Sequence, residues 1–287
     1  MPDNVPLLLP TLGGPFGWAD VRVLGPWRLQ QSALTGHHRL LGPSDVRLAW
    51  GTRDVCEALF ERHAPATSRP HLVVLLHGLL GAKNVFEPMS RALYDAGYGV
   101  AAVNYPSALR GLADHADQVR GILDATEGVD TVSFVGHSMG GIVARAVTAT
   151  PGAWRERMKL HRLVTLASPN TGSTLAGRLR NTPGFDVILG PAARDVAPDQ
   201  VLPEPGCPLG AVIATRGDGR GYNPLIDGDD DGVIAAAEAG WPGAEDTLVV
   251  HGIHTMLPLR TDVIAAVVRY LATGRFQGDE PLPADPA

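Results

Sequence analysis

The sequence predicts an α/β protein with a doubly wound, mostly parallel sheet and a short lid or cap insertion. From His71 onward, short runs of aliphatic and β-branched residues alternate with longer amphipathic runs, and this alternation is typical of repeated βα units. The chain has 287 residues, of which 45% are apolar, so it can bury one large core. We therefore expect a single domain.

Six runs are predicted to be strands because they are short, apolar and bounded by turn residues. They are the segments 71–76, 98–105, 130–136, 162–168, 209–215 and 247–252. Helices are predicted to begin near Val85, Leu112, Met139 and Leu259, where apolar residues recur three and four positions apart. Right-handed crossovers between parallel strands then place helices on both faces of the sheet.

Two regions interrupt the alternation. Residues 1–70 contain the strand-like runs "DVRVLGPWRL" and "DVRLAWG" and a short helix near residues 55–62, which we interpret as edge strands and a helix of the same domain. Residues 169–208 are rich in Pro and Gly, and their length indicates a cap-like insertion within the core of residues 71–276. The acidic, Pro-rich residues 277–287 are predicted to be a disordered tail.

Charge and composition exclude several classes of partner. The net charge of -6 and the pI near 5.9 argue against nucleic acid, because no basic stripe is available to neutralise phosphates. No apolar run is long enough to form an integral membrane segment, and the N-terminus lacks the pattern of a signal peptide, so we expect a cytoplasmic protein. Cys56 and Cys207 form no CxxC pair, which leaves a single disulfide between them open. The oligomeric state is not indicated.

The strongest chemical signal is the run "VSFVGHSMGG", a predicted strand that ends in G-x-S-x-G with Ser138 at its centre. A serine on a tight turn between a strand and a helix needs a strained backbone, and the flanking Gly136 and Gly140 remove side chains that would clash there. The turn exposes the Ser138 hydroxyl. It also places the amide of Met139, at the start of the helix, where it can face a developing oxyanion.

With this motif the chain resembles the α/β-hydrolase fold family, and within it the bacterial lipases and carboxylesterases that carry "GHSMGG". The resemblance runs from about Leu72 to Phe276 and includes "NYPS", "SPNTGS" and "GPAARDVAPD" in the same order along the chain. It implies that "LLHGLLG" supplies the second amide of an oxyanion hole, from Leu79. It also implies that His77 shapes this loop and does not transfer protons.

Serine needs a histidine base, and the base needs an acid that holds its tautomer. The family order places both after the serine. His254, in the loop before the last helix, is the predicted base, whereas His251 belongs to the end of a strand. The alternative is that His254 is a packed or solvated histidine. The resemblance implies that "DGVI" carries the acid, Asp231.

The stretch from Asp227 to Glu238, "DGDDDGVIAAAE", also matches the calcium loop of an EF-hand. An EF-hand loop lies between two helices, whereas "TRGDGRGYNPLI" before Asp227 is unsuited to a helix. We therefore expect no cofactor. Calcium at the loop from Asp227 to Asp231 stays an open alternative.

These residues predict a serine hydrolase that cleaves small-molecule or lipid carboxylic esters through an acyl-enzyme on Ser138. Ester chemistry is implied by the resemblance, since a fold alone does not determine a reaction. Two alternatives remain: an acyltransferase that uses the same triad, and a non-catalytic binding module on a hydrolase scaffold.

Overall fold

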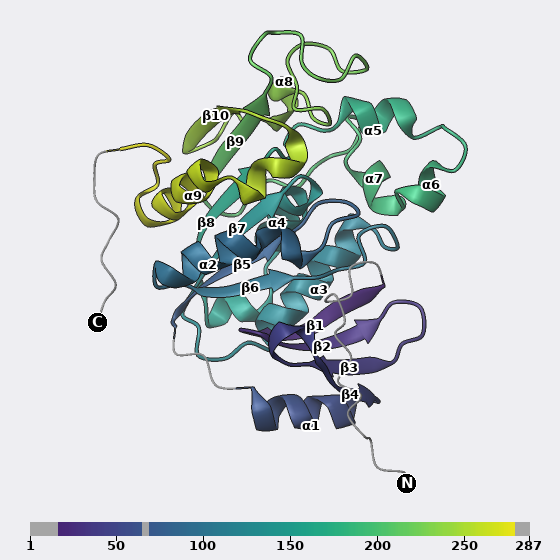
Figure 1. The fold of residues 1–287 in the computed structure, drawn as a ribbon, viewed down its shortest axis with the longest axis vertical. Helices are drawn as coiled ribbons and strands as arrows, with labels where there is room; N and C mark the ends of the chain where they lie inside the picture. Colours follow the sequence, from purple (N-terminus) through teal and green to yellow (C-terminus); the bar gives the residue numbers. More distant parts are fainter. Residues whose placement is uncertain (1–16, 65–68, 279–287) are drawn as a thin grey trace.

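The main sheet has six parallel strands in the order β10-β9-β8-β7-β5-β6 (Figure 1). The computed structural model describes residues 17–64 and 69–278. The strands are β5 (His71–Leu76), β6 (Gly99–Val103), β7 (Thr131–His137), β8 (Lys159–Leu166), β9 (Leu209–Thr215) and β10 (Asp246–His251). Each of the six predicted strands is present, and the prediction of a doubly wound, mostly parallel sheet is confirmed.

Helices cover both faces of this sheet because the strand side chains alternate between two cores. Along β5, Leu72, Val74 and Leu76 belong to one buried cluster, while Val73 and Leu75 belong to the other. The first cluster includes the apolar faces of α3 (Leu112–Asp124) and α4 (Met139–Ala149). The second includes those of α2 (Glu87–Asp95) and α9 (Thr261–Thr273). The helix starts near Leu112 and Met139 are confirmed, and the short helix η2 (Lys83–Phe86) precedes α2.

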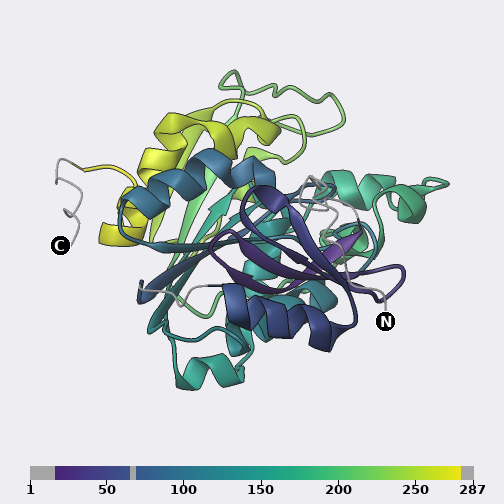
Figure 2. The same ribbon diagram turned by 60° about the horizontal axis from the view of Figure 1, so that its bottom comes forward.

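The N-terminal strands form a sheet of their own, which corrects the expectation that they are edge strands. This antiparallel sheet has the order β1-β2-β3-β4, with β1 (Trp18–Leu24), β2 (Trp27–Ser32), β3 (His38–Leu41) and β4 (Arg47–Gly51). Sequence analysis missed β3. The helix α1 (Arg53–His63) lies against this sheet, as Figure 2 shows. Its buried residues Phe60 and Cys56 belong to the same core cluster as Leu29 and Leu40 of the sheet. The strands pair with one another, and the amide of Asp20 in β1 donates to the carbonyl of Asn104 beyond β6 at 3.0 Å.

The insertion between β8 and β9 carries three short helices, α5 (Thr174–Leu179), α6 (Phe185–Ile188) and α7 (Pro191–Asp195). The buried guanidinium of Arg145 in α4 donates to the carbonyls of Asn170 and Pro203, at 2.6 and 2.7 Å, and lies 4.3 Å from the centre of the Trp241 ring. It therefore binds both ends of the insertion to the helix behind Ser138. A lid function for this segment stays a prediction.

The other short elements are η1 (Pro43–Asp45), η3 (Ala153–Glu156), α8 (Ala236–Ala239) and η4 (His254–Leu259). Cys56 and Cys207 are both free thiols, so the disulfide left open by the sequence does not form. Within residues 17–64 and 69–278, no helix has the length and apolar character that crossing a membrane requires. The N-terminal residues 1–16, and residues 279–287 of the expected tail, lie outside the described residues.

Candidate active site

Ser138 lies on a strained turn between β7 and α4. Its φ of 56° and ψ of -129° are rarely adopted by a residue with a side chain. The turn is held because the Ser138 amide donates to the carbonyl of Leu166 in β8 at 2.8 Å. A Cβ on Gly136 would overlap the backbone of Gly140 and Gly141, so only glycine permits this approach. Ser138 is half-buried, whereas His137 and Met139 on either side are buried.

Asp231 and His254 form a buried pair at the same end of the sheet. The Nδ1–H group of His254 donates to Oδ2 of Asp231 at 2.7 Å, and their side chains are 7% and 1% exposed. Oδ1 of Asp231 accepts the amides of Val233 and Ile234, at 3.0 and 2.8 Å. The His254 amide also donates to the Asp231 carbonyl at 2.9 Å. Backbone hydrogen bonds therefore fix the positions of both residues, in addition to the bond between their side chains.

His137 connects this pair to the Ser138 turn. Burial lowers the pKa of His137 to about 3, so the ring is neutral and its Nε2–H donates to the carbonyl of His254 at 3.0 Å. The two imidazole rings lie 4.7 Å apart. Within the described chain, no direct hydrogen bond joins the Ser138 hydroxyl to His254, a bond that often tightens only when substrate is bound. Sequence analysis did not single out His137, although it stands inside the G-x-S-x-G motif.

His251, the other histidine in this part of the chain, lies apart from this pair. It ends β10, is exposed, and its Nδ1 lies 3.5 Å from the Thr215 hydroxyl. Arg260 donates to its carbonyl. The tertiary structure therefore brings Asp231 together with His254, the acid and base that the resemblance implies.

The loop of residues 77–83, which we call the Leu79 loop, lies against Ser138. A Cβ on Gly78 would be 2.9 Å from the Ser138 Cβ and 3.4 Å from its hydroxyl oxygen, so the close approach needs glycine. The Gly78 carbonyl accepts hydrogen bonds from His77 Nδ1 at 2.8 Å and from the Gly81 amide at 3.1 Å. Because the Gly78 carbonyl and the Leu79 amide belong to one peptide plane, these bonds fix the direction of the Leu79 N–H.

His77 is neutral and has a defined tautomer. Burial lowers its pKa to about 4. Nε2 accepts the amide of Tyr105 at 3.4 Å, so the ring proton is on Nδ1, where it reaches the Gly78 carbonyl. The Tyr105 ring stacks on His77 at 4.1 Å, and the Tyr105 hydroxyl donates to the His77 carbonyl. These contacts agree with a role in shaping the loop.

The acidic stretch from Asp227 to Glu238 uses its carboxylates to bind backbone amides. Asp229 accepts three amides between residues 216 and 219, at 2.8 to 3.3 Å. Asp230 is completely buried and accepts the amides of Tyr222, Asn223 and Gly232, at 2.6 to 3.2 Å. The run of adjacent acids therefore folds the loop that presents Asp231.

The two ends of this stretch hold the neighbouring insertion. Asp227 is exposed and pairs with Arg178 of α5 at 2.7 Å, and Glu238 accepts the amide of Thr174 at 2.7 Å. Among the residues that the structure describes, no group of three or more His, Cys, Asp or Glu side chains could hold a metal ion. Calcium binding at the loop from Asp227 to Asp231 stays a prediction.

A cavity of about 640 Å³ lies elsewhere, between the N-terminal sheet and β6. Arg28, Asp45 and Lys83 are among the residues that line it, and neither Ser138 nor His254 is. This cavity therefore does not coincide with the candidate site. The strained serine and the buried acid–histidine pair identify that site.

Comparisons with known proteins agree with this fold. A family model described as the alpha/beta hydrolase fold matches residues 71–186. The mature form of the Bacillus licheniformis lipase BlEst2 superposes with a TM-score of 0.56 at 19% identity, over 72% of this chain and 94% of the lipase chain. Its propeptide form gives a TM-score of 0.57 at 18% identity, over 78% and 54%. Among curated proteins, none matches the sequence.

At these identities the structural similarity concerns the fold alone. The matched family model covers the strand that leads to Ser138, the Leu79 loop and the helix behind them. The sheet order, the turn at Ser138 and this match lead to one conclusion. The chain has an α/β-hydrolase fold, and the family model matches its residues 71–186.

Proposed function

We propose that the protein is a serine hydrolase that cleaves carboxylic esters through an acyl-enzyme on Ser138. The observation that carries the proposal is the position of His254, whose Nδ1–H is held by Asp231 while its backbone is held by His137, the residue before Ser138. This arrangement leaves Nε2 of His254 as the basic nitrogen. It has the donor and acceptor order that a serine nucleophile requires.

In the first half of the reaction, the Ser138 hydroxyl oxygen attacks the ester carbonyl carbon, and Nε2 of His254 takes the hydroxyl proton. Asp231 stabilises the resulting imidazolium and keeps the ring in place. The carbonyl oxygen becomes an oxyanion that accepts hydrogen bonds from the amides of Leu79 and Met139. The tetrahedral intermediate collapses, the bond to the alcohol oxygen breaks, and His254 returns the proton to the departing alcohol.

In the second half, water replaces the alcohol. His254 takes a proton from the water as its oxygen attacks the acyl carbon, and the same two amides stabilise the second oxyanion. Collapse breaks the bond to the Ser138 oxygen, which regains its proton from His254. The carboxylic acid leaves and the enzyme is restored.

The test is hydrolysis of a p-nitrophenyl ester series from acetate to palmitate. We expect Ser138→Ala to lower kcat/KM by roughly 10⁴-fold or more, because the covalent step is lost. A fluorophosphonate should label the wild-type protein once, at Ser138, as read by mass spectrometry of peptides. Unchanged ester turnover in Ser138→Ala would show that the nucleophile is elsewhere.

His254→Asn and His251→Asn form a matched pair that tests the base. The change at His254 removes the nitrogen that takes the proton, whereas the His251 ring lies beside the Thr215 hydroxyl, away from the pair of Asp231 and His254. We expect a large loss of kcat only at His254. Equal losses would contradict the proposed role of His254.

A calcium chelator in the same assay tests the acidic loop. Amide donors already occupy the carboxylates of Asp229 and Asp230, so we expect the rates to be unchanged. A loss of activity that added calcium restores would mean that the loop binds the ion.

A further inference from the structure

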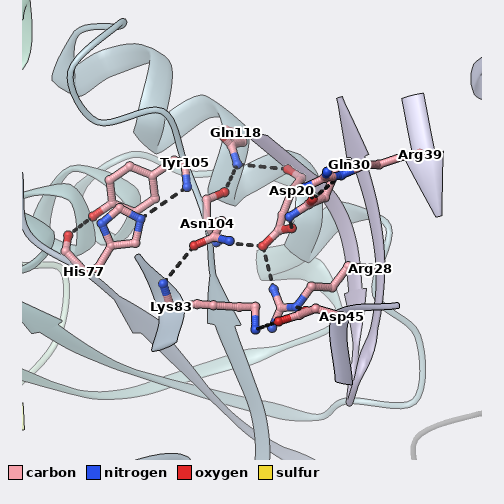
Figure 3. A network of polar contacts seen from close by, with 10 residues as sticks. All are labelled: Asp20, Arg28, Gln30, Arg39, Asp45, His77, Lys83, Asn104, Tyr105 and Gln118. Carbon is pink, nitrogen blue, oxygen red and sulfur yellow. Dashed lines mark hydrogen bonds and ion pairs between the residues drawn. The ribbon is translucent and has the colours of Figure 1, made fainter. Parts of the chain in front are cut away.

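The Leu79 loop is tied at its far end to the N-terminal sheet (Figure 3). Lys83 ends the loop, and its amide donates to Oδ1 of Asn104 at 2.8 Å. Its side-chain ammonium pairs with Oδ2 of Asp45 at 2.7 Å, with only 14% and 18% of the two side chains exposed. Asp45 belongs to the turn between β3 and β4. A residue of the separate N-terminal sheet thus holds one end of the loop that lies against Ser138.

Asn104 is in turn fixed by the same sheet. Its amide donates to Oδ2 of the completely buried Asp20 at 2.6 Å, and the Asp20 amide donates back to the Asn104 carbonyl at 3.0 Å. Arg28 and Gln30 in β2 donate to the two oxygens of Asp20, each at 2.7 Å. The side-chain amide of Gln118 bridges the carbonyls of Asp20 and Asn104, at 2.9 Å to each.

The near end of the loop rests on the residues that follow Asn104. Tyr105 stacks on His77, and the hydroxyl of Ser107 accepts the amide of Leu80 at 3.0 Å. Figure 3 shows His77, Tyr105, Asn104 and Asp20 in one continuous network that runs from the loop to β1. Both ends of the Leu79 loop are therefore bound to a support that includes the N-terminal sheet.

Residues with a strained backbone lie at the candidate site and at the contact between Asp45 and Lys83. In the described chain, five residues other than glycine have positive φ: Ser44, Asp45, Leu80, Ser138 and Ala167. Ser138 and Leu80 belong to the candidate site and its loop, and Ala167 follows the strand that binds the Ser138 amide. The other two are consecutive and present the Asp45 carboxylate to Lys83. Such strain persists where the surrounding structure enforces it and is concentrated at functional sites.

We propose that the N-terminal sheet positions the oxyanion hole, with Asp45 and Lys83 as positioning residues that act through the Leu79 loop. This inference rests on the proposed function and adds the support on which the Leu79 amide depends. Neither residue touches the reacting atoms. Their contribution is to hold a donor where charge develops in the transition state.

Two variants test the proposal. Lys83→Met keeps most of the side-chain stem and removes the charge, and Asp45→Asn is nearly isosteric. Asp45 also has Arg28 at 3.9 Å, so Lys83→Met does not leave an isolated carboxylate. The matched control is Arg91→Met, which breaks the exposed ion pair with Glu87 on the neighbouring helix.

We expect kcat to fall about tenfold in each variant at unchanged KM, which is less than the roughly 10²–10³-fold loss when an oxyanion donor is removed outright. The Kd of a trifluoromethyl ketone, whose adduct carries an oxyanion, should rise by the same factor. The double variant should be no worse than the single variants, since both changes remove the same ion pair between Lys83 and Asp45. Arg91→Met should match wild type.

Hydrogen exchange gives a readout that does not depend on turnover. Exchange at the amides of residues 77–83 should become faster in Lys83→Met and Asp45→Asn but not in Arg91→Met. Unchanged exchange and unchanged ketone affinity would overturn the positioning role, even if both variants melted at lower temperature. A protein that hydrolyses no ester but shows faster loop exchange would refute the proposed function and leave the loop support intact.

Discussion

Replacement of Asp231 by Asn should nearly abolish activity by reversing the tautomer of His254. The Oδ1 atom of Asp231 accepts two backbone amides, at 2.8 and 3.0 Å, and Oδ2 faces Nδ1 of His254 at 2.7 Å. In the variant, the amide oxygen must keep facing the two backbone donors, so the new NH2 group points at Nδ1. An NH2 group donates, so Nδ1 must accept and the ring proton moves to Nε2.

A proton on Nε2 leaves His254 unable to take the proton of Ser138. The same inversion in a serine protease triad lowers kcat by about 10⁴-fold, which corresponds to about 5.5 kcal/mol of transition-state stabilisation. We expect a loss of this order in kcat/KM for a short p-nitrophenyl ester, with KM little changed.

Asp230→Asn is the control, because Asp230 is adjacent, equally buried and bonded to amides but does not contact His254. Its effect should appear in the melting temperature more than in kcat. The reasoning fails if Asp231→Asn retains more than a tenth of wild-type activity, or if Asp230→Asn is as inactive as Asp231→Asn while remaining folded.

Two further predictions concern stability. Burial lowers the pKa of His77 to about 4 and of His137 to about 3, whereas both titrate near 6.5 when unfolded; the unfolded chain therefore binds more protons as pH falls below 6.5. Each of the two histidines should lower the free energy of unfolding by about 1.4 kcal/mol at pH 5.5. Urea unfolding at pH 7.5 and 5.5 measures this loss, which should be smaller in His137→Gln than in the wild-type protein. Gly140→Ala should destabilise by about 3 kcal/mol or more, because its Cβ would overlap the Leu76 carbonyl, whereas Gly121→Ala in α3 meets nothing within 4 Å and should stabilise by up to about 1 kcal/mol in thermal melts. A small destabilisation by Gly140→Ala would contradict the predicted overlap with Leu76. A loss of stability between pH 7.5 and 5.5 that is the same in His137→Gln as in wild type would contradict the predicted role of His137.

Much of the core could be predicted because its signals are local. The strand β7 reads as an apolar run, and the glycines around Ser138 report the space that the turn leaves for a side chain. The prediction that the N-terminal strands are edge strands of the main sheet was wrong because the sequence pattern of a strand does not indicate which strand it pairs with. The strand β3 was missed because its four residues, "HRLL", are too short to show a period.

The acidic loop shows the same division. Its sequence matches a calcium loop, which needs closely spaced carboxylates, and the same run contains the single aspartate that a triad requires. Only the folded chain shows that Asp229 and Asp230 face different sets of amides and that Asp231 alone faces His254.

The sequence by itself therefore determined the class of fold and the position of Ser138, because hydrophobic periodicity and glycine requirements act over a few residues. The tertiary structure alone decided the contact of His137 with the backbone of His254 and the attachment of the Leu79 loop to Asp45. These contacts join residues 117 and 38 positions apart in the chain. Such distant pairs depend on how sheets pack and where their loops meet, which no local pattern encodes.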